Sequence, residues 1–357
     1  MHESAAPAPA RRRPTVSVVV PCYRYGRFLP DCVGSILDQE GVDVRILVID
    51  DASPDDSAQV ALRLAAEDER VEARIHEVNK GHIATYNEGL LEWADGDYSI
   101  LISADDLLTP GSIKRATDVM EADPDVGFVY GHALKWVDSD PRPEPRTATT
   151  GTTIWSGAEW LRIVCGLGHS VVTAPEVVVR TSVQQRIGGY LPELPHTADL
   201  EMWMRFAVHG GVAYVKGADQ ALYRAHGTNM TVERVPLIDL QQRKAAFNAL
   251  FDAYGDDVAD GRRLRRRADR RMAKEALWRA CRAYERRSLD RTPVGELEAF
   301  AREGYPHARR LPEFWGLRWR EKAGPDLCPY LQPLMLSAVH RKLRNELWWR
   351  RWAREGI

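Results

Sequence analysis

The chain has 357 residues, enough for one large domain or two domains of ordinary size. Its formal net charge of −2 argues against a nucleic-acid partner, although arginines gather near residue 12 and across residues 262–271. The five cysteines include no Cys-x-x-Cys pair and are odd in number, which indicates a reducing compartment rather than a disulfide framework. No apolar run approaches the roughly 18 residues of a transmembrane segment, so we expect a cytoplasmic protein.

Strands and helices are expected to alternate along the first third of the chain. Thr15–Pro21 (TVSVVVP) is β-branched and almost wholly apolar, as in a strand buried on both faces of a parallel sheet. Similar patterns predict strands at Val44–Ile49, Ala73–Val78 and from Tyr98, and helices at Leu29–Gln39, from about Ser57 to Ala66 and from Ala84 to Trp93. This order predicts an α/β fold with a doubly wound, mostly parallel sheet flanked by helices.

Two of the expected strands end in paired carboxylates. Asp50 and Asp51 follow the second strand, and Asp105 and Asp106 follow the strand that begins at Tyr98. Both pairs should lie at the carboxyl edge of the sheet, where open α/β sheets bind ligands. Asx turns are the alternative explanation, but the repetition favours a nucleotide-plus-metal site. One acid can accept hydrogen bonds from a base or ribose, and another can hold a divalent cation that neutralises a diphosphate.

Several motifs together resemble the family 2 glycosyltransferases of the GT-A fold, which is Rossmann-like. They are, in order, Val16–Tyr23, Val48–Asp55, Asn79–Gly81 with Asn87–Gly89, and Gly96–Asp106. The resemblance covers roughly residues 15–230. It implies an enzyme that transfers a sugar from a nucleotide diphosphate donor with inversion, usually with Mg²⁺ or Mn²⁺.

The resemblance also implies roles in binding the donor. Asp51 would bind the base, and Pro21 and Tyr23 would line its pocket. An Asp can accept the imide N–H of uracil or thymine and a Tyr ring can stack on the base, so we expect a UDP- or TDP-sugar. An ordinary half-buried aromatic is the alternative for Tyr23. The other residues assigned to donor binding are Asp50, Lys80, Gly81, Asp105 and Arg224.

By the same resemblance, Asp106 is the direct metal ligand and His226 a metal or diphosphate ligand, with Asp105 closer to the ribose or a metal-bound water. A neutral imidazole suits Mn²⁺ better than Mg²⁺, although a structural histidine is the commoner use of this residue. Many members carry an acid where this chain has Ser103. We therefore expect fewer protein ligands to the metal, or weaker binding, than is usual in the family.

Asp199 is our choice for the catalytic base. The family places its base here, usually as the second acid of a Glu-Asp pair, and Ala198 replaces the first. Inversion by direct displacement needs one carboxylate to take the acceptor's proton while the metal carries charge on the leaving diphosphate. Glu201 is the second choice, although it would point to a different helix face. A helix-capping acid is the alternative explanation for Asp199.

The middle of the chain should bind the acceptor. We expect strands at Phe128–His132 and Val177–Arg180, a surface loop at Ser139–Thr153, and helical segments at Trp155–Val164, Val183–Ile187 and from His196 to Phe206. The segment Gly168-His169-Ser170 sits where the family places a loop beside the donor sugar. Its glycine allows a close approach of backbone to ligand.

The C-terminal third favours helix. Helices are expected at Val235–Tyr254, Gly261–Arg287, Val294–Arg302 and Leu331–Trp352. The arginine block at 262–267 could bind an anionic partner, but a solvated helix face is the commoner explanation. The run from Leu347 to Trp352 could form an interfacial helix in peripheral contact with a membrane. We prefer packing against the catalytic domain or against a second subunit, and the second alternative would give a homodimer through the C-terminal helices.

We therefore expect a disordered leader over residues 1–14, a GT-A catalytic domain over 15–234 with a nucleotide-binding half (15–110) and an acceptor half (111–234), and a helical region over 235–357. The predicted function is transfer of a sugar to an acceptor hydroxyl or amine of a small-molecule natural product or a cell-surface glycan. A sugar nucleotidyltransferase is disfavoured, because its Gly-rich, Arg- and Lys-bearing signature is absent near the first strand. A non-catalytic nucleotide-sugar-binding or scaffold protein remains the alternative because of Ser103 and Ala198.

Overall fold

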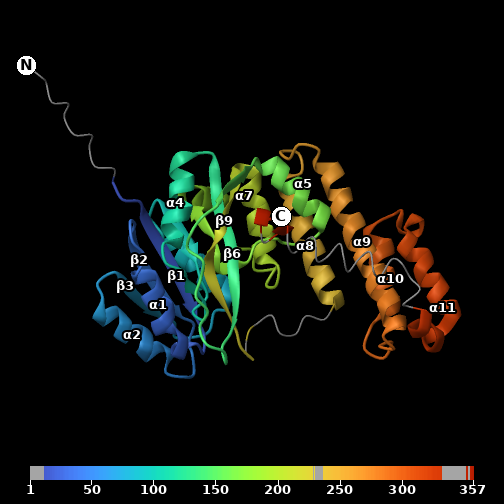
Figure 1. Ribbon diagram of the computed structural model, residues 1–357, viewed down its shortest axis with the longest axis horizontal. Coiled ribbons are helices and arrows are strands. Elements are labelled where there is room, and N and C mark those ends of the chain that lie inside the picture. Colours follow the sequence, from blue (N-terminus) through green and yellow to red (C-terminus); the bar gives the residue numbers. More distant parts are fainter. Residues whose placement is uncertain (1–11, 228, 230–235, 332–350, 353) are drawn as a thin grey trace, which may run out of the picture.

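The computed structural model describes residues 12–227, 229, 236–331, 351–352 and 354–357 (Figure 1). The strands are β1 Thr15–Cys22, β2 Asp43–Asp50, β3 Val71–Ile75, β4 Tyr98–Leu101, β5 Leu107–Leu108, β6 Val126–Val137, β7 Gly151–Trp155, β8 Val178–Arg180 and β9 Gly211–Ala225. The α-helices are α1 Leu29–Leu37, α2 Ser57–Glu67, α3 His82–Asn87, α4 Ser112–Ala122, α5 Gly157–Leu167, α6 Thr181–Ile187, α7 Ala198–His209, α8 Pro236–Tyr254, α9 Gly261–Glu285, α10 Val294–Gly304 and α11 Pro312–Leu331. Shorter helical segments are η1 Gly26–Phe28, η2 Glu88–Trp93, η3 Ala174–Glu176 and η4 Ala308–Arg310.

The strands form one sheet in the order β3-β2-β1-β4-β8-β6-β9-β5, with β7 paired to β9. The strands β3, β2, β1 and β4 run parallel, and Val18 of β1 lies opposite Ile46 of β2 and Ile100 of β4. Beyond β4 the sheet is mixed, because β8 runs antiparallel to both neighbours while β6 and β9 run parallel. The expected α/β fold is confirmed, with its parallel part concentrated where the paired acids lie.

Several boundaries differ from the sequence prediction for local reasons. Trp155 belongs to β7, and α5 starts two residues later because Ser156 caps it. The Ser156 Oγ accepts the Glu159 backbone N–H at 3.3 Å while the Glu159 carboxylate accepts the Ser156 N–H at 3.0 Å. The loop prediction over Ser139–Thr153 is therefore wrong for its last three residues, which are in β7. Strand β9 and helix α11 were not expected at all.

Two apolar layers enclose the parallel part of the sheet. On β1, Val16, Val18 and Val20 face one layer and Val19 faces the other, as the period of two in a strand requires. The first layer includes residues of α1, α2 and α4. The second runs on without a break from the sheet into the C-terminal helices, through Phe128, Trp160, Trp203, Phe247, Leu264, Met272, Leu297 and Leu317.

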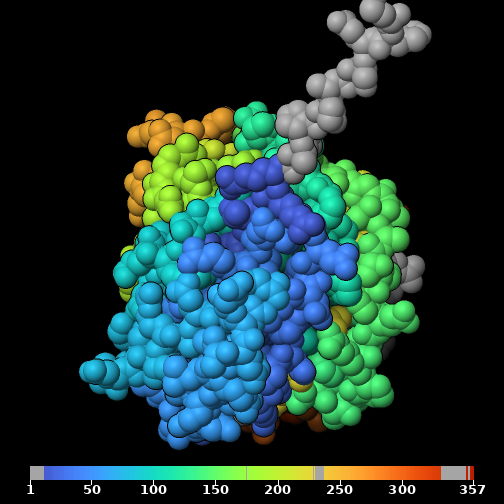
Figure 2. Space-filling model, turned by 90° about the vertical axis from the view of Figure 1, so that its left-hand side faces the viewer, coloured from blue at the N-terminus to red at the C-terminus, as the bar shows by residue number. Residues whose placement is uncertain are grey.

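The two ends of the molecule are built from opposite ends of the chain. Figure 1 shows α10 and α11 on the side away from β3 and α2. Figure 2 views the molecule from the β3 and α2 end, where the blue surface of the N-terminal elements lies beside the green surface of the middle of the chain. No helix within the described residues is long and apolar enough to cross a membrane. Of the predicted leader, residues 1–11 lie outside the described residues, as does most of the predicted helix Leu331–Trp352 (332–350).

Candidate active site

The turns after β1 and β2 hold unusual backbone conformations. Arg24 has φ of 62° and Ala52 has φ of 56°, a region that residues other than glycine rarely adopt. The Arg24 backbone N–H donates to Ser53 Oγ at 2.9 Å, which ties the two turns together. Pro21 is half-buried at the end of β1, and the Tyr23 side chain is 45% exposed. Strained turns of this kind cluster at functional sites.

Asp51 is buried at the end of β2 and held from several sides. Its Oδ1 accepts the backbone N–H of Lys80 at 2.8 Å, and its Oδ2 accepts that of Gly81 at 2.9 Å. The Nδ1 of His76 lies 2.8 Å from Oδ1. Burial raises the pKa of Asp51, but the hydrogen bonds from His76, Lys80 and Gly81 outweigh it, so the net pKa is lowered. The carboxylate therefore stays ionised and can only accept hydrogen bonds.

A second acid, Glu88, anchors the far side of this cluster. Its carboxylate lies 3.1 Å from His76 Nε2 and accepts from Lys80 Nζ at 2.8 Å and from Arg74 Nη1 at 2.9 Å. Burial raises the pKa of Glu88, yet these cations bring it down to about 2. His76 was missed from the sequence because it lies in none of the motifs, and Glu88, although it lies in the Asn87–Gly89 motif, was given no role. The Lys80 side chain, assigned to the donor, is here paired with Glu88.

Asp50 behaves differently from Asp51. It is fully buried, and its Oδ2 accepts the Ser53 backbone N–H at 3.0 Å within the turn. Its Oδ1 has no hydrogen-bond partner among the described residues. An unpaired buried carboxylate oxygen is unfavourable unless a ligand or water satisfies it. The assignment of Asp50 to the donor stays a prediction.

Asp105 and Asp106 lie buried between β4 and β5, against the end of β9. Asp106 Oδ1 accepts the Arg224 backbone N–H at 2.9 Å, and Asp105 Oδ2 lies 2.9 Å from His226 Nε2 and 3.2 Å from Asn229 Nδ2. Burial raises the pKa of both acids, and the charge of Asp105 raises that of Asp106 further. Two adjacent buried carboxylates with raised pKa are groups that a divalent cation would stabilise. The fold thus gathers four of the predicted residues, Asp105, Asp106, Arg224 and His226, and Asn229 was given no role from the sequence.

Arg224 is held firmly by its neighbours. Its guanidinium donates to Asp31 at 2.9 Å, to Asp138 at 2.8 Å and to the backbone oxygen of Asp105 at 2.9 Å. It also lies between the rings of Phe28 and Trp136, at 4.7 and 4.4 Å. These contacts fix the end of β9 against the Asp105 turn. A direct contact of Arg224 with a diphosphate stays a prediction.

Asp105, Asp106 and His226 could hold a cation only together with oxygen atoms from a bound ligand. Within the part of the chain that the structure describes, no three His, Cys, Asp or Glu side chains form a metal site by themselves. Ser103 contributes its backbone oxygen, which accepts the Asp106 N–H at 3.0 Å. The carboxylates and imidazole at Asp105, Asp106 and His226 are donors that Mn²⁺ accepts, and a bound diphosphate could supply further oxygens.

Asp199 and Glu201 have separate surroundings on α7. Asp199 lies in the first turn, half-buried. Burial raises the pKa of Tyr190, and the charge and hydrogen bonding of Asp199 raise it further. Glu201 is 2% exposed and pairs with Arg205 Nη2 at 2.7 Å, while Arg205 also donates to the backbone oxygens of Ile187 and Gly189. Arg205 therefore joins α7 to the preceding loop and Glu201 is engaged in its ion pair with Arg205, which favours Asp199 as the chemically available acid.

Tyr86 and Glu176 connect the acids of β4 and β5 with Asp199. Burial raises the pKa of Tyr86, and the charges of Asp199 and Asp105 raise it further. Burial likewise raises the pKa of Glu176 well above its usual range, with smaller contributions from Asp106 and Asp199. Both side chains therefore lie within electrostatic range of both acid groups. Asp199 and the Asp105 pair thus act on the same two buried side chains, Tyr86 and Glu176, which sequence reasoning had missed.

The loop after α5 is held by residues far along the chain. Arg243 Nη1 on α8 donates to the Gly168 backbone oxygen at 2.9 Å, and Arg271 Nε on α9 donates to that of Leu167 at 3.1 Å. Trp352 Nε1 donates to the backbone oxygen of Val171 at 2.9 Å. The Trp352 side chain is only 9% exposed, so it packs within the molecule.

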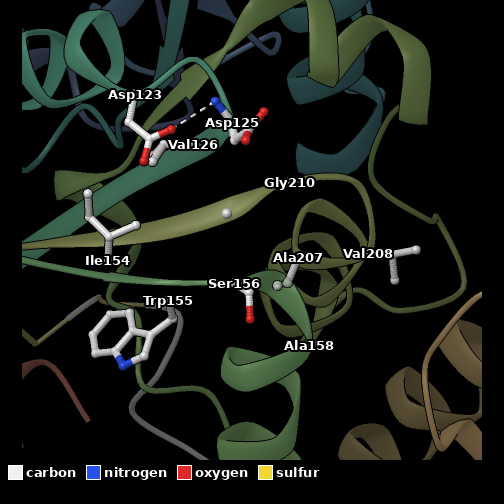
Figure 3. Close-up of a pocket in the computed structure, with 12 residues that line it drawn as sticks. Asp123, Asp125, Val126, Ile154, Trp155, Ser156, Ala158, Ala207, Val208 and Gly210 are labelled. Carbon is white, nitrogen blue, oxygen red and sulfur yellow. Dashed lines mark hydrogen bonds between the residues drawn. The ribbon is translucent and has the colours of Figure 1, made fainter.

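Two surface hollows lie at opposite ends of β6 and β9. One is lined by Lys135, Val137, Tyr223, Ala225, His226, Gly227 and Asn229, next to the Asp105 pair. The other, shown in Figure 3, is lined by residues at the start of β6 and β9 and around Ser156, with Asp123 and Asp125 at its edge. Because β6 and β9 run parallel, the hollow of Figure 3 lies at the far ends of these strands from the acids.

The chain is similar to glycosyltransferases in sequence. The family model described as "Glycosyl transferase family 2" matches residues 17–163. Uncharacterized protein MT1568 of Mycobacterium tuberculosis is 28% identical over 214 residues, which cover 57% of this chain and 65% of that protein. Glycosyltransferase GlyG of Streptococcus pneumoniae is 33% identical over 126 residues, 35% of this chain and 41% of that protein. The matched regions thus span less than two thirds of either relative.

Solved structures share the fold. S. aureus TarS 1-349 in complex with UDP-GlcNAc has a TM-score of 0.62 at 14% identity, over 87% of this chain and 91% of that one. Mannosyltransferase PcManGT from Pyrobaculum calidifontis, in complex with GDP-Man and Mn²⁺, has a TM-score of 0.52 at 15% identity, over 93% of this chain and 88% of that one. At such identity these structures establish the fold alone.

Proposed function

The chain is a family 2 glycosyltransferase with the GT-A fold, and on that premise we propose that it transfers a sugar from a UDP- or TDP-sugar, with inversion, to an acceptor hydroxyl or amine. One observation carries the proposal. The ionised Asp51 follows β2 and the buried pair Asp105 and Asp106 follows β4, at the edge of the sheet where ligands bind in such folds. Asp199, in the first turn of α7, raises the pKa of Tyr86 and Glu176 as members of that pair do. The acceptor is proposed to be a small-molecule natural product or a cell-surface glycan.

Donor binding is assigned to the ends of β1 and β2. Asp51 accepts an N–H of the base, beside Pro21 and the exposed ring of Tyr23, which can stack on it. The Gly81 N–H that holds Asp51 comes from a loop with space around it, since a side-chain carbon placed on Gly81 would meet no heavy atom within 4 Å. UDP-GlcNAc in TarS and GDP-Man in the mannosyltransferase support a nucleotide-sugar donor.

A divalent cation is assigned to the second acid pair. Asp106 and His226 would hold Mn²⁺ or Mg²⁺, with Asp105 beside them, and the Mn²⁺ of the mannosyltransferase supports this assignment. When bound, the cation would neutralise charge that develops on the leaving diphosphate. The chain's own part is to keep the two carboxylates together through Arg224, His226 and Asn229.

Asp199 is assigned as the general base. It would take the proton of the acceptor hydroxyl or amine as that oxygen or nitrogen attacks the anomeric carbon from the face opposite the diphosphate. The hydrogen bond with Tyr190 and the start of α7 orient its carboxylate. Because Glu201 is paired with Arg205, it cannot take this role without breaking a buried ion pair.

The remaining assignments concern the whole chain. We propose a catalytic domain over 15–234, with halves 15–110 and 111–234, and a helical region from 235, supported by the start of α8 at Pro236. A cytoplasmic location and a homodimer through the C-terminal helices are proposed with it.

The test is turnover with Mn²⁺ and a panel of UDP-, TDP- and GDP-sugars, after thermal-shift screening of the same compounds. We expect a UDP- or TDP-sugar to raise the melting temperature and to release nucleoside diphosphate. Asp199→Asn should lower kcat by about 10²- to 10⁴-fold with little change in donor binding. Asp106→Ala should abolish turnover, whereas Asp125→Asn, at the distant hollow, should leave it unchanged. Donor binding without turnover in the wild type would instead favour a scaffold protein.

A further inference from the structure

His76 lies between two carboxylates and belongs to no motif of the sequence. It follows β3, and its side chain is only 3% exposed. Its Nδ1 lies 2.8 Å from Asp51 Oδ1, and its Nε2 lies 3.1 Å from Glu88 Oε2. The imidazole thus links the end of β2 to the first residue of η2.

Both ring nitrogens of His76 lie within hydrogen-bonding distance of a carboxylate oxygen. Asp51 and Glu88 are ionised at neutral pH, because their hydrogen bonds and nearby cations lower the pKa of each carboxyl. An ionised carboxylate can only accept. A nitrogen of the ring that contacts either acid therefore forms a hydrogen bond only as a donor, and an N–H toward Asp51 is the contact that fixes that side chain.

Glu88 is itself immobilised. Lys80 Nζ and Arg74 Nη1 both donate to it, at 2.8 and 2.9 Å, in addition to His76. Two cations and the imidazole of His76 therefore surround one carboxylate that is 13% exposed. Because Glu88 cannot rotate without losing these contacts, it fixes the plane of the His76 ring.

Asp51 keeps one acceptor position. A carboxylate offers about four lone-pair sites on its two oxygens. Oδ1 receives His76 and the Lys80 N–H, and Oδ2 receives the Gly81 N–H, the three contacts that the described residues supply. The fourth site is on Oδ2, beside Gly81, where the space around that glycine is open.

We infer that His76 and Glu88 are positioning residues that turn the remaining lone pair of Asp51 toward an N–H of the donor nucleobase. The inference rests on the proposed function, in which Asp51 binds the base. His76 does not touch the nucleotide. It sets the rotation of the Asp51 side chain, and Glu88 sets the rotation of His76. The ligand class that fits one acceptor is a base with an imide N–H, such as uracil or thymine.

The experiment measures binding of UDP and of UDP methylated at N3, with Mn²⁺, by calorimetry. The methylated compound lacks the one N–H that Asp51 would accept. We expect the wild type to prefer UDP by about 10- to 100-fold, as for one hydrogen bond to a charged group. In His76→Phe, which keeps a ring but no donor, the preference should fall to threefold or less, roughly, because Asp51 is then free to rotate. His76→Asn, whose amide can still donate to Asp51, should restore part of the preference.

Two further variants separate positioning from folding. Glu88→Gln should lower the preference less than His76→Phe, because His76 stays in place. Glu72→Gln is the matched control, since Glu72 lies on β3 and pairs with Arg45 away from Asp51, and it should leave the preference unchanged.

The outcomes are distinct. An equal loss of affinity for both compounds in His76→Phe, or no preference in the wild type, would overturn the inference while leaving a UDP-dependent enzyme. Failure of the wild type to bind UDP at all would overturn the proposed uridine donor and, with it, this inference. A preference that falls in His76→Phe and returns in His76→Asn supports the positioning role.

Discussion

The donor side and the acceptor side of the site are held together in different ways. Asp51 is fixed by His76, Lys80, Gly81 and Glu88, all within forty residues of it along the chain. The loop around Gly168 is fixed instead from α8, α9 and the C-terminal end of the chain. The proposed nucleotide site is thus held locally, whereas the loop around Gly168, in the proposed acceptor half (111–234), depends on the helical region. On that proposal, we expect acceptor choice to change with the helical region while the donor site stays the same.

An ion-pair cluster between α8 and α9 is the strongest link on the acceptor side. Arg243 donates to both oxygens of Glu275, at 2.9 and 3.2 Å, to Asp239 at 3.0 Å and to the Gly168 backbone oxygen. Arg279 also contacts Glu275 and Asp239, but its side chain is 25% exposed.

The largest effect is expected for Arg243→Met. It leaves Glu275 and Asp239 without their buried partner and frees the Gly168 oxygen, which should lower the free energy of unfolding by about 3–5 kcal/mol. Urea unfolding measures the change. Arg279→Met is the control and should cost about 1 kcal/mol, because its contacts are partly exposed. A comparable loss of unfolding free energy in both variants would contradict the larger contribution expected of Arg243.

Acid should weaken the same cluster. Burial raises the pKa of Glu275, but Arg243 and Arg279 outweigh it and bring that pKa from 4.5 to about 2. A lowered folded pKa gives stability that is fully present above pH 4.5 and is lost as the pH falls toward 2. The loss is on the order of 2–3 kcal/mol. We expect the melting temperature of Glu275→Gln, already lower at pH 7, to fall less steeply between pH 4.5 and 2 than that of the wild type.

The sequence was informative where the site is local. The acid pairs at 50–51 and 105–106 each end an apolar strand, so their shared edge follows from the strand order. His76 could not be found, and Glu88, within the Asn87–Gly89 motif, could be given no role, because only the folded chain links them to Asp51. Strand β9 was missed because Asp219 and Gln220 interrupt its apolar pattern. Both are buried in the fold, where His132 and Arg146 pair with Asp219.

Asn87 links the donor side to the acceptor side, and we expect its substitution to have an effect of intermediate size. Its Oδ1 accepts the Tyr190 N–H at 2.7 Å, and its Nδ2 donates to the Tyr190 backbone oxygen at 2.9 Å. Asn87→Ala should lower the free energy of unfolding by about 1–3 kcal/mol, since it leaves both groups unpaired. It should also lower kcat, because Tyr190 adjoins Asp199. Asn248→Ala, which removes one contact to Arg265 on α9, should leave kcat unchanged. Unchanged kcat in Asn87→Ala would mean that the two sides are independent.

The smallest effect is expected for Trp352→Phe, which removes one hydrogen bond and keeps an aromatic ring near His132. In the wild type the ring centroids of Trp352 and His132 lie 5.6 Å apart. Loss of the bond to the Val171 oxygen should lower the free energy of unfolding by about 0.5–1.5 kcal/mol. Because that oxygen belongs to the loop after α5, in the proposed acceptor half and away from Asp51, we expect the KM for the acceptor to rise while the KM for the donor stays constant. Trp319→Phe, at a side chain on α11 that is 43% exposed, should change neither. If Trp352→Phe changed the KM for the donor instead, the donor side would also depend on the C-terminal end. The contacts around Asp51 would then not be enough to explain the geometry of the donor side.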